Sequence, residues 1–196
     1  VNATDLGLND TFTYLWNFGD GNIASVQAAT NIYKDNGDYN IYLTVKDDDG
    51  GSVTEEKNII INNVPPTLSA TIPVKQYEGR KVELLAEVAN DPGSDDSHTF
   101  LFNFGDGTIT NDPTHIYQDN DEYEIQIILS DDDDGSDTLN QKISIINLPP
   151  NILGELPKKS NEGQNLNFQI VVEDPGNLDT HSYFWDYGDG SYDSTL

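Results

Sequence analysis

The chain has 196 residues, and its 35 acidic and 9 basic side chains give a formal net charge of -26 at pH 7. This charge argues against nucleic acid and anionic membranes as partners, because attraction to phosphate needs Lys and Arg, and the absence of Cys excludes disulfides and thiol chemistry. Hydrophobic residues (35%) and aromatic residues (10%) are still frequent enough for folded cores.

Short alternating runs of apolar and polar residues predict β-strands throughout the chain. The first run ends in LWNFGDG at Leu15–Gly21, and two longer runs follow at Tyr39–Val45 and Ser52–Ile61. The next strands are expected at Thr67–Thr71, Lys81–Val88, His98–Phe104, Thr114–Ile116, Glu122–Leu129 and Leu139–Ile146. Strands at this spacing, separated by Gly, Asn, Asp and Pro, indicate an all-β fold of immunoglobulin-like β-sandwiches.

The aromatic-GDG phrase occurs three times, and Gly19, Gly105 and Gly188 are 86 and 83 residues apart. An interval of this size predicts a tandem array with one small domain per repeat. We expect a partial repeat at 1–64 that lacks its first strands, a complete repeat at 65–148, and a partial repeat at 149–196 that ends after its GDG turn. The segment is thus interpreted as part of a longer array.

Aromatic residues recur at equivalent positions of the repeats. Trp16, Phe102 and Trp185 lie in the strand where such sandwiches bury a large aromatic side chain. Tyr39 and Tyr123 begin the next long strand, where a tyrosine corner is expected. These positions predict core residues rather than a platform for stacking sugars.

These phrases together resemble the PKD domain, the polycystic kidney disease repeat. That family typically carries a WDFGDG turn, then an H-x-Y strand, then a G-x-Y-x-V-x-L-x-V-x-D strand. Here LWNFGDG, LFNFGDG and FWDYGDG match the turn, and HIYQDNDEYEIQIILSD and YKDNGDYNIYLTVKD match the strands. The resemblance covers all three repeats, although Asn31 stands where His115 stands one repeat later. It makes Asp20, Asp106 and Asp189 of the GDG phrase structural turn residues rather than catalytic ones.

Acidic residues gather in two loops that a sandwich of this topology brings to one end. A D-[PL]-G-x-x-D phrase precedes each aromatic strand, and an acidic run follows a later strand. The linker Asn residues enter at the same end. Taking the first Asp of each run, which directly follows its strand, we expect these metal ligands: Asp5, Asp10, Asp47, Asn63, Asp91, Asp96, Asp131, Asn147, Asp174 and Asp179.

Converging carboxylates repel one another by a few kcal/mol per close pair at an effective dielectric of ~20. Because Lys and Arg are scarce, a divalent cation would offset this repulsion, and Ca²⁺ accepts ~6–8 oxygen ligands. Zn²⁺ is disfavoured by the lack of Cys and by only three His, and Mg²⁺ is less suited to an all-protein cage. The resemblance adds that some PKD domains bind calcium near this end. The alternative is that these Asp residues only form turns and keep the protein soluble.

No catalytic constellation repeats with the domains, so we do not expect an enzyme. His98 and His181 occupy the same position beside an Asp, which permits an acid–base reading. A histidine that binds the neighbouring loop is the simpler interpretation. No nucleophile elbow or phosphate-binding loop accompanies it.

The preferred hypothesis is a non-catalytic spacer in a large extracellular surface protein, such as an adhesin, surface-layer or filament component. Ca²⁺ at the junctions would stiffen the array, with neighbouring repeats sharing ligands through short Pro-containing linkers. Glu78 and Glu162 lie at the opposite end of their domains, where they could face the following junction. The expected partners are neighbouring repeats, other surface proteins or polysaccharide, without direct membrane contact.

Two further interpretations remain open from the sequence. PKD-type domains also accompany secreted hydrolases, so the chain could be an accessory module that binds carbohydrate or protein through Tyr14, Tyr42 or Tyr183. The acidity could instead suit a salty habitat or concentrate cations at a cell surface. Sequons at Asn2 and Asn9 permit glycosylation, and an exposed sheet edge would allow homo-oligomeric assembly.

Overall fold

The computed structural model describes residues 10–195, which form an all-β structure. No helix long and apolar enough to span a membrane occurs within that range. By its contacts the chain divides into two compact units. One comprises Val1–Leu68, Val88–Phe100 and Leu129–Asp137, and the other comprises Ser69–Glu87, Leu101–Ile128 and Thr138–Leu196.

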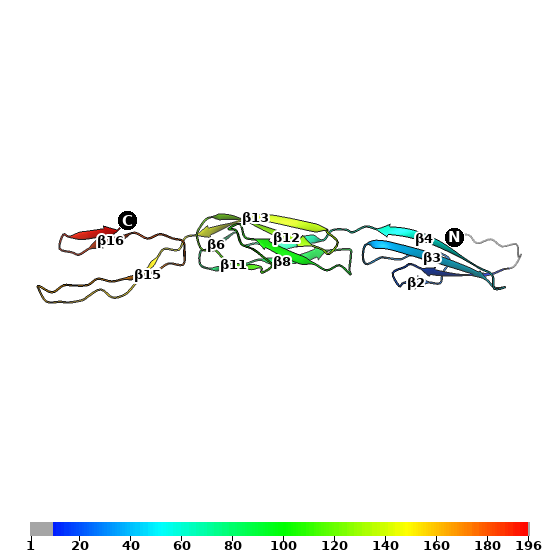
Figure 1. Ribbon diagram of the computed structural model, residues 1–196, viewed down its shortest axis with the longest axis horizontal. Coiled ribbons are helices and arrows are strands. Elements are labelled where there is room, and N and C mark those ends of the chain that lie inside the picture. Colours follow the sequence, from blue (N-terminus) through cyan, green and yellow to red (C-terminus); the bar gives the residue numbers. More distant parts are fainter. Residues whose placement is uncertain (1–9, 196) are drawn as a thin grey trace. The chain divides into compact units, whose positions relative to one another are not determined.

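Four antiparallel strands form the sheet of the first repeat (Figure 1). Their order across the sheet is β2 (Ile23–Ala24), β1 (Phe12–Asn17), β3 (Gly37–Asp47) and β4 (Ser52–Ile61). The hairpin of β3 and β4 is paired along its length, from Gly37 opposite Ile61 to Lys46 opposite Ser52. Leu43 and Val45, two residues apart on β3, are buried on one face of the sheet, as the strand period of two requires.

The middle repeat contains one five-stranded sheet and two strand pairs. The sheet has the order β10 (Ile109–Thr110), β9 (Thr99–Asn103), β12 (Glu122–Ser130), β13 (Ser136–Ile146) and β6 (Lys75–Tyr77). One pair joins β11 (Thr114–Ile116) to β7 (Lys81–Glu83), and the other joins β5 (Thr67–Thr71) to β8 (Leu85–Asn90). Short loops connect its strands, and no helix lies between them in this described part of the chain.

The core of the middle repeat follows from the alternation of its strands. Ile125, Ile127 and Leu129 occupy every second position of β12 and have no exposed surface. Burying such a side chain stabilises the fold by about 1.5–3 kcal/mol. The hydroxyl of Tyr117, also fully buried, donates a hydrogen bond of 2.8 Å to the carbonyl of Phe104, so that this core contains no unsatisfied phenol.

The third repeat consists of two separate antiparallel pairs. β14 (Asn151–Leu153) pairs with β15 (Val171–Glu173), and β16 (Tyr183–Asp186) pairs with β17 (Tyr192–Thr195). Most of its large apolar side chains are exposed, including Phe184, whose side chain is 69% exposed. The described part of this repeat therefore has a much smaller core than the middle repeat.

Several predicted strands match the structure, and one prediction was wrong. Three strands match residue for residue: Thr67–Thr71, Thr114–Ile116 and Ser52–Ile61. The single strand expected at Lys81–Val88 is instead β7 and β8, interrupted at Leu84. The amide of Leu84 donates to the carbonyl of Pro113 and its side chain is buried, so the backbone leaves one strand pair there and enters another. β6, which pairs in parallel with β13, was not predicted.

The expected aromatic core holds fully only in the middle repeat. Phe102 is 3% exposed, whereas Trp16 and Trp185 are half-buried. The described part of the first repeat forms a single sheet, and that of the third repeat forms two separate strand pairs. Neither described part therefore provides a complete second sheet that would cover its Trp side chain. The tyrosine corner is confirmed: the hydroxyls of Tyr39 and Tyr123 each donate 3.1 Å hydrogen bonds to a carbonyl four residues upstream.

The GDG phrase forms a structural turn, as predicted. Gly105 and Gly107 have positive φ values of 82° and 97°, which L-residues with a side chain disfavour. The carboxylate of Asp106 accepts a 2.9 Å hydrogen bond from the amide of Thr108. A Cβ added to Gly105 would lie 2.6 Å from the carbonyl oxygen of Glu124, so the first glycine also permits close packing on β12.

Candidate metal centre

One candidate centre lies in the first compact unit, where two loops of the middle repeat meet the chain that leads into it. The first loop follows β8 and the second joins β12 to β13. In the first, Asp91 Oδ1 accepts from the amide of Gly93 at 3.0 Å, and the amide of Asp96 donates to the carbonyl of Gly93 at 3.2 Å. This compact turn directs two carboxylates of one short loop to the same place.

The second loop is closed by a carboxylate. Asp131 Oδ1 accepts from the amides of Asp133 and Gly135 at 3.0 and 2.6 Å. Asp131 Oδ2 accepts a 2.8 Å hydrogen bond from the side-chain amide of Asn63. The linker residue and the loop therefore meet, as the sequence predicted for Asn63 and Asp131.

Three carboxylates from these loops converge. Asp91, Asp96 and Asp131 each present an oxygen, and these oxygens lie within 4.8 Å of one another. Burial, and next the negative charges of Asp91 and further acidic neighbours, raise the pKa of Asp96. The hydrogen bond from Asn63 has the opposite effect on Asp131 and lowers its pKa, although burial opposes that shift.

An overlapping group adds a residue that the sequence reasoning missed. Asp35, from the turn before β3, lies with Asp96 and Asp133 in a second set whose oxygens are within 4.8 Å. The carbonyl of Lys34 accepts from the amide of Asp95 at 3.2 Å, so the two turns also touch through their backbones. Asp35 and Asp119 occupy equivalent positions in two repeats. This recurrence is the sequence feature that could have identified Asp35 as a candidate ligand.

One buried oxygen of this group has no partner in the described part of the chain. Within the described residues, Asp96 Oδ1 is buried and has no hydrogen-bond partner. The carboxylate of Asp96 lies beside those of Asp91 and Asp131, and no ion pair of the described residues joins any of the three to Lys or Arg. An all-oxygen set of carboxylates, with the Asn63 amide beside it, is the chemistry that Ca²⁺ prefers.

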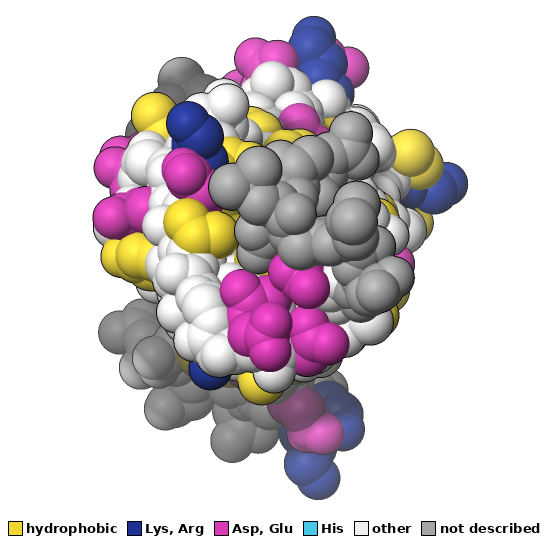
Figure 2. Space-filling view, turned by 90° about the vertical axis from the view of Figure 1, so that its right-hand side faces the viewer, with side chains coloured by type: hydrophobic (Ala, Val, Ile, Leu, Met, Phe, Trp, Pro, Cys, Tyr) yellow, Lys and Arg dark blue, Asp and Glu magenta, His cyan; other side chains and the backbone are white. Residues whose placement is uncertain are grey.

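The first repeat also contains a group of three carboxylates, but only one of them was an expected ligand. Asp10, Asp48 and Asp49 lie within the same limit. Acidic side chains form a patch on the face shown in Figure 2. The expected ligand Asp47 is not in this group, and its Oδ1 instead accepts from the amide of Gly51 at 2.6 Å. Asp5 lies outside the described residues.

The expected ligands of the third repeat share no group of three acidic side chains among the described residues. Asp174 Oδ1 accepts from the amide of Gly176, and its Oδ2 lies 2.7 Å from His181 Nε2. Asp179 belongs to another group, with Glu78 and Asp119. Asn147 is exposed.

The repeated histidines bind the neighbouring loop, as the simpler interpretation expected. His98 Nε2 lies 2.7 Å from Asp91 Oδ2, and His181 makes the same contact in the third repeat. The side chain of Asp91 is 5% exposed, so this contact fixes its orientation. Each histidine therefore holds a loop carboxylate in position.

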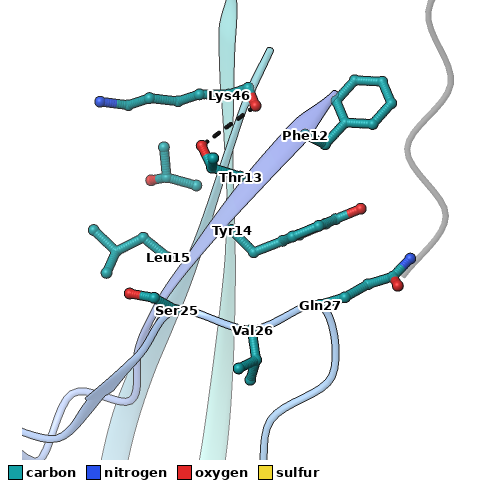
Figure 3. Close-up of a pocket in the computed structure, with 9 residues that line it drawn as sticks. Phe12, Thr13, Tyr14, Leu15, Ser25, Val26, Gln27 and Lys46 are labelled. Atoms are coloured by element: carbon teal, nitrogen blue, oxygen red, sulfur yellow. Dashed lines mark hydrogen bonds between the residues drawn. The ribbon is translucent and has the colours of Figure 1, made fainter. Parts of the chain in front are cut away.

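A separate hollow in the first repeat surrounds Tyr14 (Figure 3). Phe12 and Tyr14 of β1 lie on the same side of this strand, and the side chain of Tyr14 extends on the side of Gln27. The other two aromatics proposed for binding differ. Tyr42 donates a 2.9 Å hydrogen bond to Glu56 across the sheet, and Tyr183 is 37% exposed.

The sequence matches the family described as PKD domain over residues 1–61 and 63–145. This chain belongs to the PKD-domain family. PKD domains are in general non-catalytic modules, and their sandwich supplies both the GDG turn and the loops that carry the carboxylates.

The relatives of these PKD domains include collagenases. The chain is 36% identical to collagenase ColA of Bacillus cereus over 70 residues, which are 36% of this chain and 7% of that protein. It is 46% identical to collagenase ColA of Clostridium perfringens over 46 residues, 24% of this chain and 4% of that protein. The PKD chain thus spans less than a tenth of either relative.

Among solved structures, the extracellular domain of protocadherin GammaB4 is similar at 18% identity and a TM-score of 0.27. The similarity covers 87% of this chain and 33% of that one.

Proposed function

We propose that this chain is a non-catalytic spacer of an extracellular surface protein, in which Ca²⁺ bound at the repeat junctions stiffens the array. The proposal divides the chain into repeats at 1–64, 65–148 and 149–196. The observation that carries it is the group of Asp35, Asp96 and Asp133, because Asp35 comes from one repeat and the other two come from the next.

Bound Ca²⁺ would supply the positive charge that the carboxylates lack. Asp91, Asp96 and Asp131 would hold it through side-chain oxygens, while His98 fixes Asp91 and Asn63 fixes Asp131. With the charge neutralised, Asp35 can lie beside Asp96 without repulsion. Without Ca²⁺, the negative charges of Asp35 and Asp96 repel each other, and the linker between the two repeats is free to bend.

The test is thermal unfolding of the whole chain in Ca²⁺, in Mg²⁺ and in excess chelator at constant ionic strength. Binding to the folded state alone stabilises it by ~2.7 kcal/mol at a hundredfold excess over Kd. We expect a rise in melting temperature that is specific to Ca²⁺ and is lost in Asp91→Asn. Glu122→Gln removes one exposed charge elsewhere and serves as the control. Equal small responses to all salts would indicate charge screening and would contradict the proposal.

Rigidity itself needs a second measurement. Small-angle X-ray scattering of the same protein should show a narrower distribution of maximum dimensions in Ca²⁺ than in chelator. If Ca²⁺ binds but the distribution does not change, the metal site is retained and the stiffening of the array is contradicted.

A second candidate function is an accessory binding module of a secreted hydrolase. The hollow around Tyr14 and the collagenase relatives favour it. Pull-down on collagen, chitin and cellulose tests it, with Tyr14→Ala as the variant. Retention of the wild type but not of the variant would favour this function over the spacer.

A further inference from the structure

The second compact unit contains a buried acid that nothing described so far explains. Glu78 follows β6, and its side chain has no exposed surface. Its Oε1 accepts a 2.5 Å hydrogen bond from the amide of Leu148. Its Oε2 is buried and has no hydrogen-bond partner within residues 10–195. A buried carboxylate oxygen without a partner is costly, so such groups normally bind a proton or a cation.

Two more carboxylates lie close to the carboxylate of Glu78. Asp119, in the turn between β11 and β12, and Asp179, in the loop after β15, have oxygens within 4.8 Å of Glu78 and of each other. Neither contributes to an ion pair among the described residues, and neither does Glu78. Three segments far apart in sequence thus bring negative charge to one point without a basic side chain.

The backbone holds each of these three acids in place. The amide of Glu78 donates to the carbonyl of Ile146 at 3.1 Å. The carbonyl of Asp119 accepts from the Tyr123 hydroxyl of the tyrosine corner. The amide of Asp179 donates to the carbonyl of Gly176 at 3.1 Å. These bonds position the backbone of all three acids, and such preorganisation lowers the entropic cost of binding.

Two glycines allow the loop after β15 to approach Glu78. A Cβ on Gly79 would lie 2.7 Å from Pro175 Cβ, and a Cβ on Gly176 would lie 3.0 Å from the carboxyl carbon of Glu78. Both contacts are shorter than a side chain tolerates without displacement. These glycines let the carboxylates of separate segments come together.

The pair Asp119 and Asp179 repeats the pair Asp35 and Asp96 at the same sequence positions, 84 and 83 residues earlier. The supporting backbone contact repeats as well. The amide of Leu178 donates to the carbonyl of Gln118 at 3.4 Å, as Asp95 does to Lys34 in the other unit. The arrangement is therefore a recurrent feature of this chain.

We propose that Glu78, Asp119 and Asp179 form a second divalent-cation centre, in which Glu78 and Asp119 come from the middle repeat and Asp179 from the third. Carboxylate ligands without nitrogen or sulfur select a hard cation, and Ca²⁺ tolerates the irregular geometry better than Mg²⁺. Main-chain carbonyls and water would complete its coordination. The role of this centre in linking two repeats rests on the proposed spacer function. Cation binding by these three acids is independent of it.

Calorimetric titration of the whole chain with Ca²⁺ tests this centre. We expect the stoichiometry to fall by one equivalent, or one affinity to weaken at least tenfold, in Asp179→Asn and in Glu78→Gln. Asp193→Asn, in the same repeat but outside the group, should match the wild type. Far-ultraviolet circular dichroism identifies variants that fail to fold. Asp179→Asn removes the charge from a loop, so it keeps the test valid if Glu78→Gln unfolds.

The outcomes separate the two proposals. If Asp91→Asn loses an equivalent and Asp179→Asn does not, the second centre is overturned and the spacer proposal stands. If only Asp179→Asn loses one, the second centre stands and the first centre is overturned. If Asp179→Asn and Glu78→Gln both fold and both leave the titration unchanged, the second centre is overturned.

Discussion

Replacing Asp96 by Asn should change stability in opposite directions with and without Ca²⁺. Asp96 belongs to two of the three carboxylate groups of the first unit, and its Oδ1 lacks a hydrogen-bond partner among the described residues. In chelator the charge of Asp96 is a source of repulsion, so its removal should stabilise the fold. In Ca²⁺ the same charge is a ligand, so its removal should destabilise it.

The size of the effect follows from the distances. Two carboxylate oxygens at 4.8 Å repel by ~3.5 kcal/mol at an effective dielectric of 20 and by ~0.9 kcal/mol in bulk water. Since Asp96 keeps part of its surface in water, we expect a stabilisation near the lower value in chelator. This raises the melting temperature by about 4–8 °C for a repeat of this size. In Ca²⁺ the variant should lose most of the ~2.7 kcal/mol expected at a hundredfold excess.

Thermal melts of the variant and the wild type, followed by circular dichroism, measure the change in stability in Ca²⁺ and in chelator. Asp95→Asn is the matched control, because Asp95 is an exposed neighbour that carries the same charge and lies outside both groups. If Asp96→Asn were less stable than the wild type in both solutions, its carboxylate would be a structural hydrogen-bond acceptor. The reasoning from repulsion would then be refuted.

Three other predictions concern the middle repeat. Tyr117→Phe leaves the buried carbonyl of Phe104 without its donor, and urea unfolding should show a loss of about 1–3 kcal/mol. Burial opposes the charge of Asp106, but hydrogen bonds from a backbone amide and a histidine outweigh it and lower its pKa. This stabilisation is complete above the ordinary pKa of about 3.9 and is lost as the pH falls through the lowered pKa. Asp106→Asn should therefore cost about 1–3 kcal/mol at pH 7, and denaturant titrations should show this difference shrinking below pH 4. Gly105→Ala combines a positive φ with a Cβ placed 2.6 Å from the carbonyl of Glu124, so its free energy of unfolding, measured by urea denaturation, should fall by more than the ~1–2 kcal/mol of the φ strain alone.

Much of the fold could be predicted because its signals are local. Alternation located β4, β5 and β11 to the residue, and the tyrosine corner followed from Tyr39 and Tyr123. β6 was missed because its pairing with β13 depends on chain nearly 70 residues away. The interruption at Leu84 was missed for the same reason, since it depends on Pro113.

The candidate sites were predictable only in part. The convergence of Asp91, Asp96 and Asp131 follows from the ends of strands in a sandwich. The contributions of Asp35 and Asp119 were missed, because both lie in turns whose local pattern is ordinary. They become part of a group only where a loop of the following repeat approaches, and no local period encodes that contact.

Turn formation and cation binding are competing explanations for the Asp residues, and the two oxygens of Asp131 have different hydrogen-bond partners. Asp47 and Asp131 close equivalent turns through Oδ1, each accepting from a glycine amide four residues later at 2.6 Å. In Asp131 the other oxygen accepts from Asn63. One oxygen therefore shapes the loop, and the other meets the linker. Substituting Asp131 would damage the turn as well as the site, so loss of stability alone does not identify a ligand. Asp96 is more informative, because its Oδ1 is buried without a partner in the described chain, and only a change that depends on the identity of the cation distinguishes the two roles.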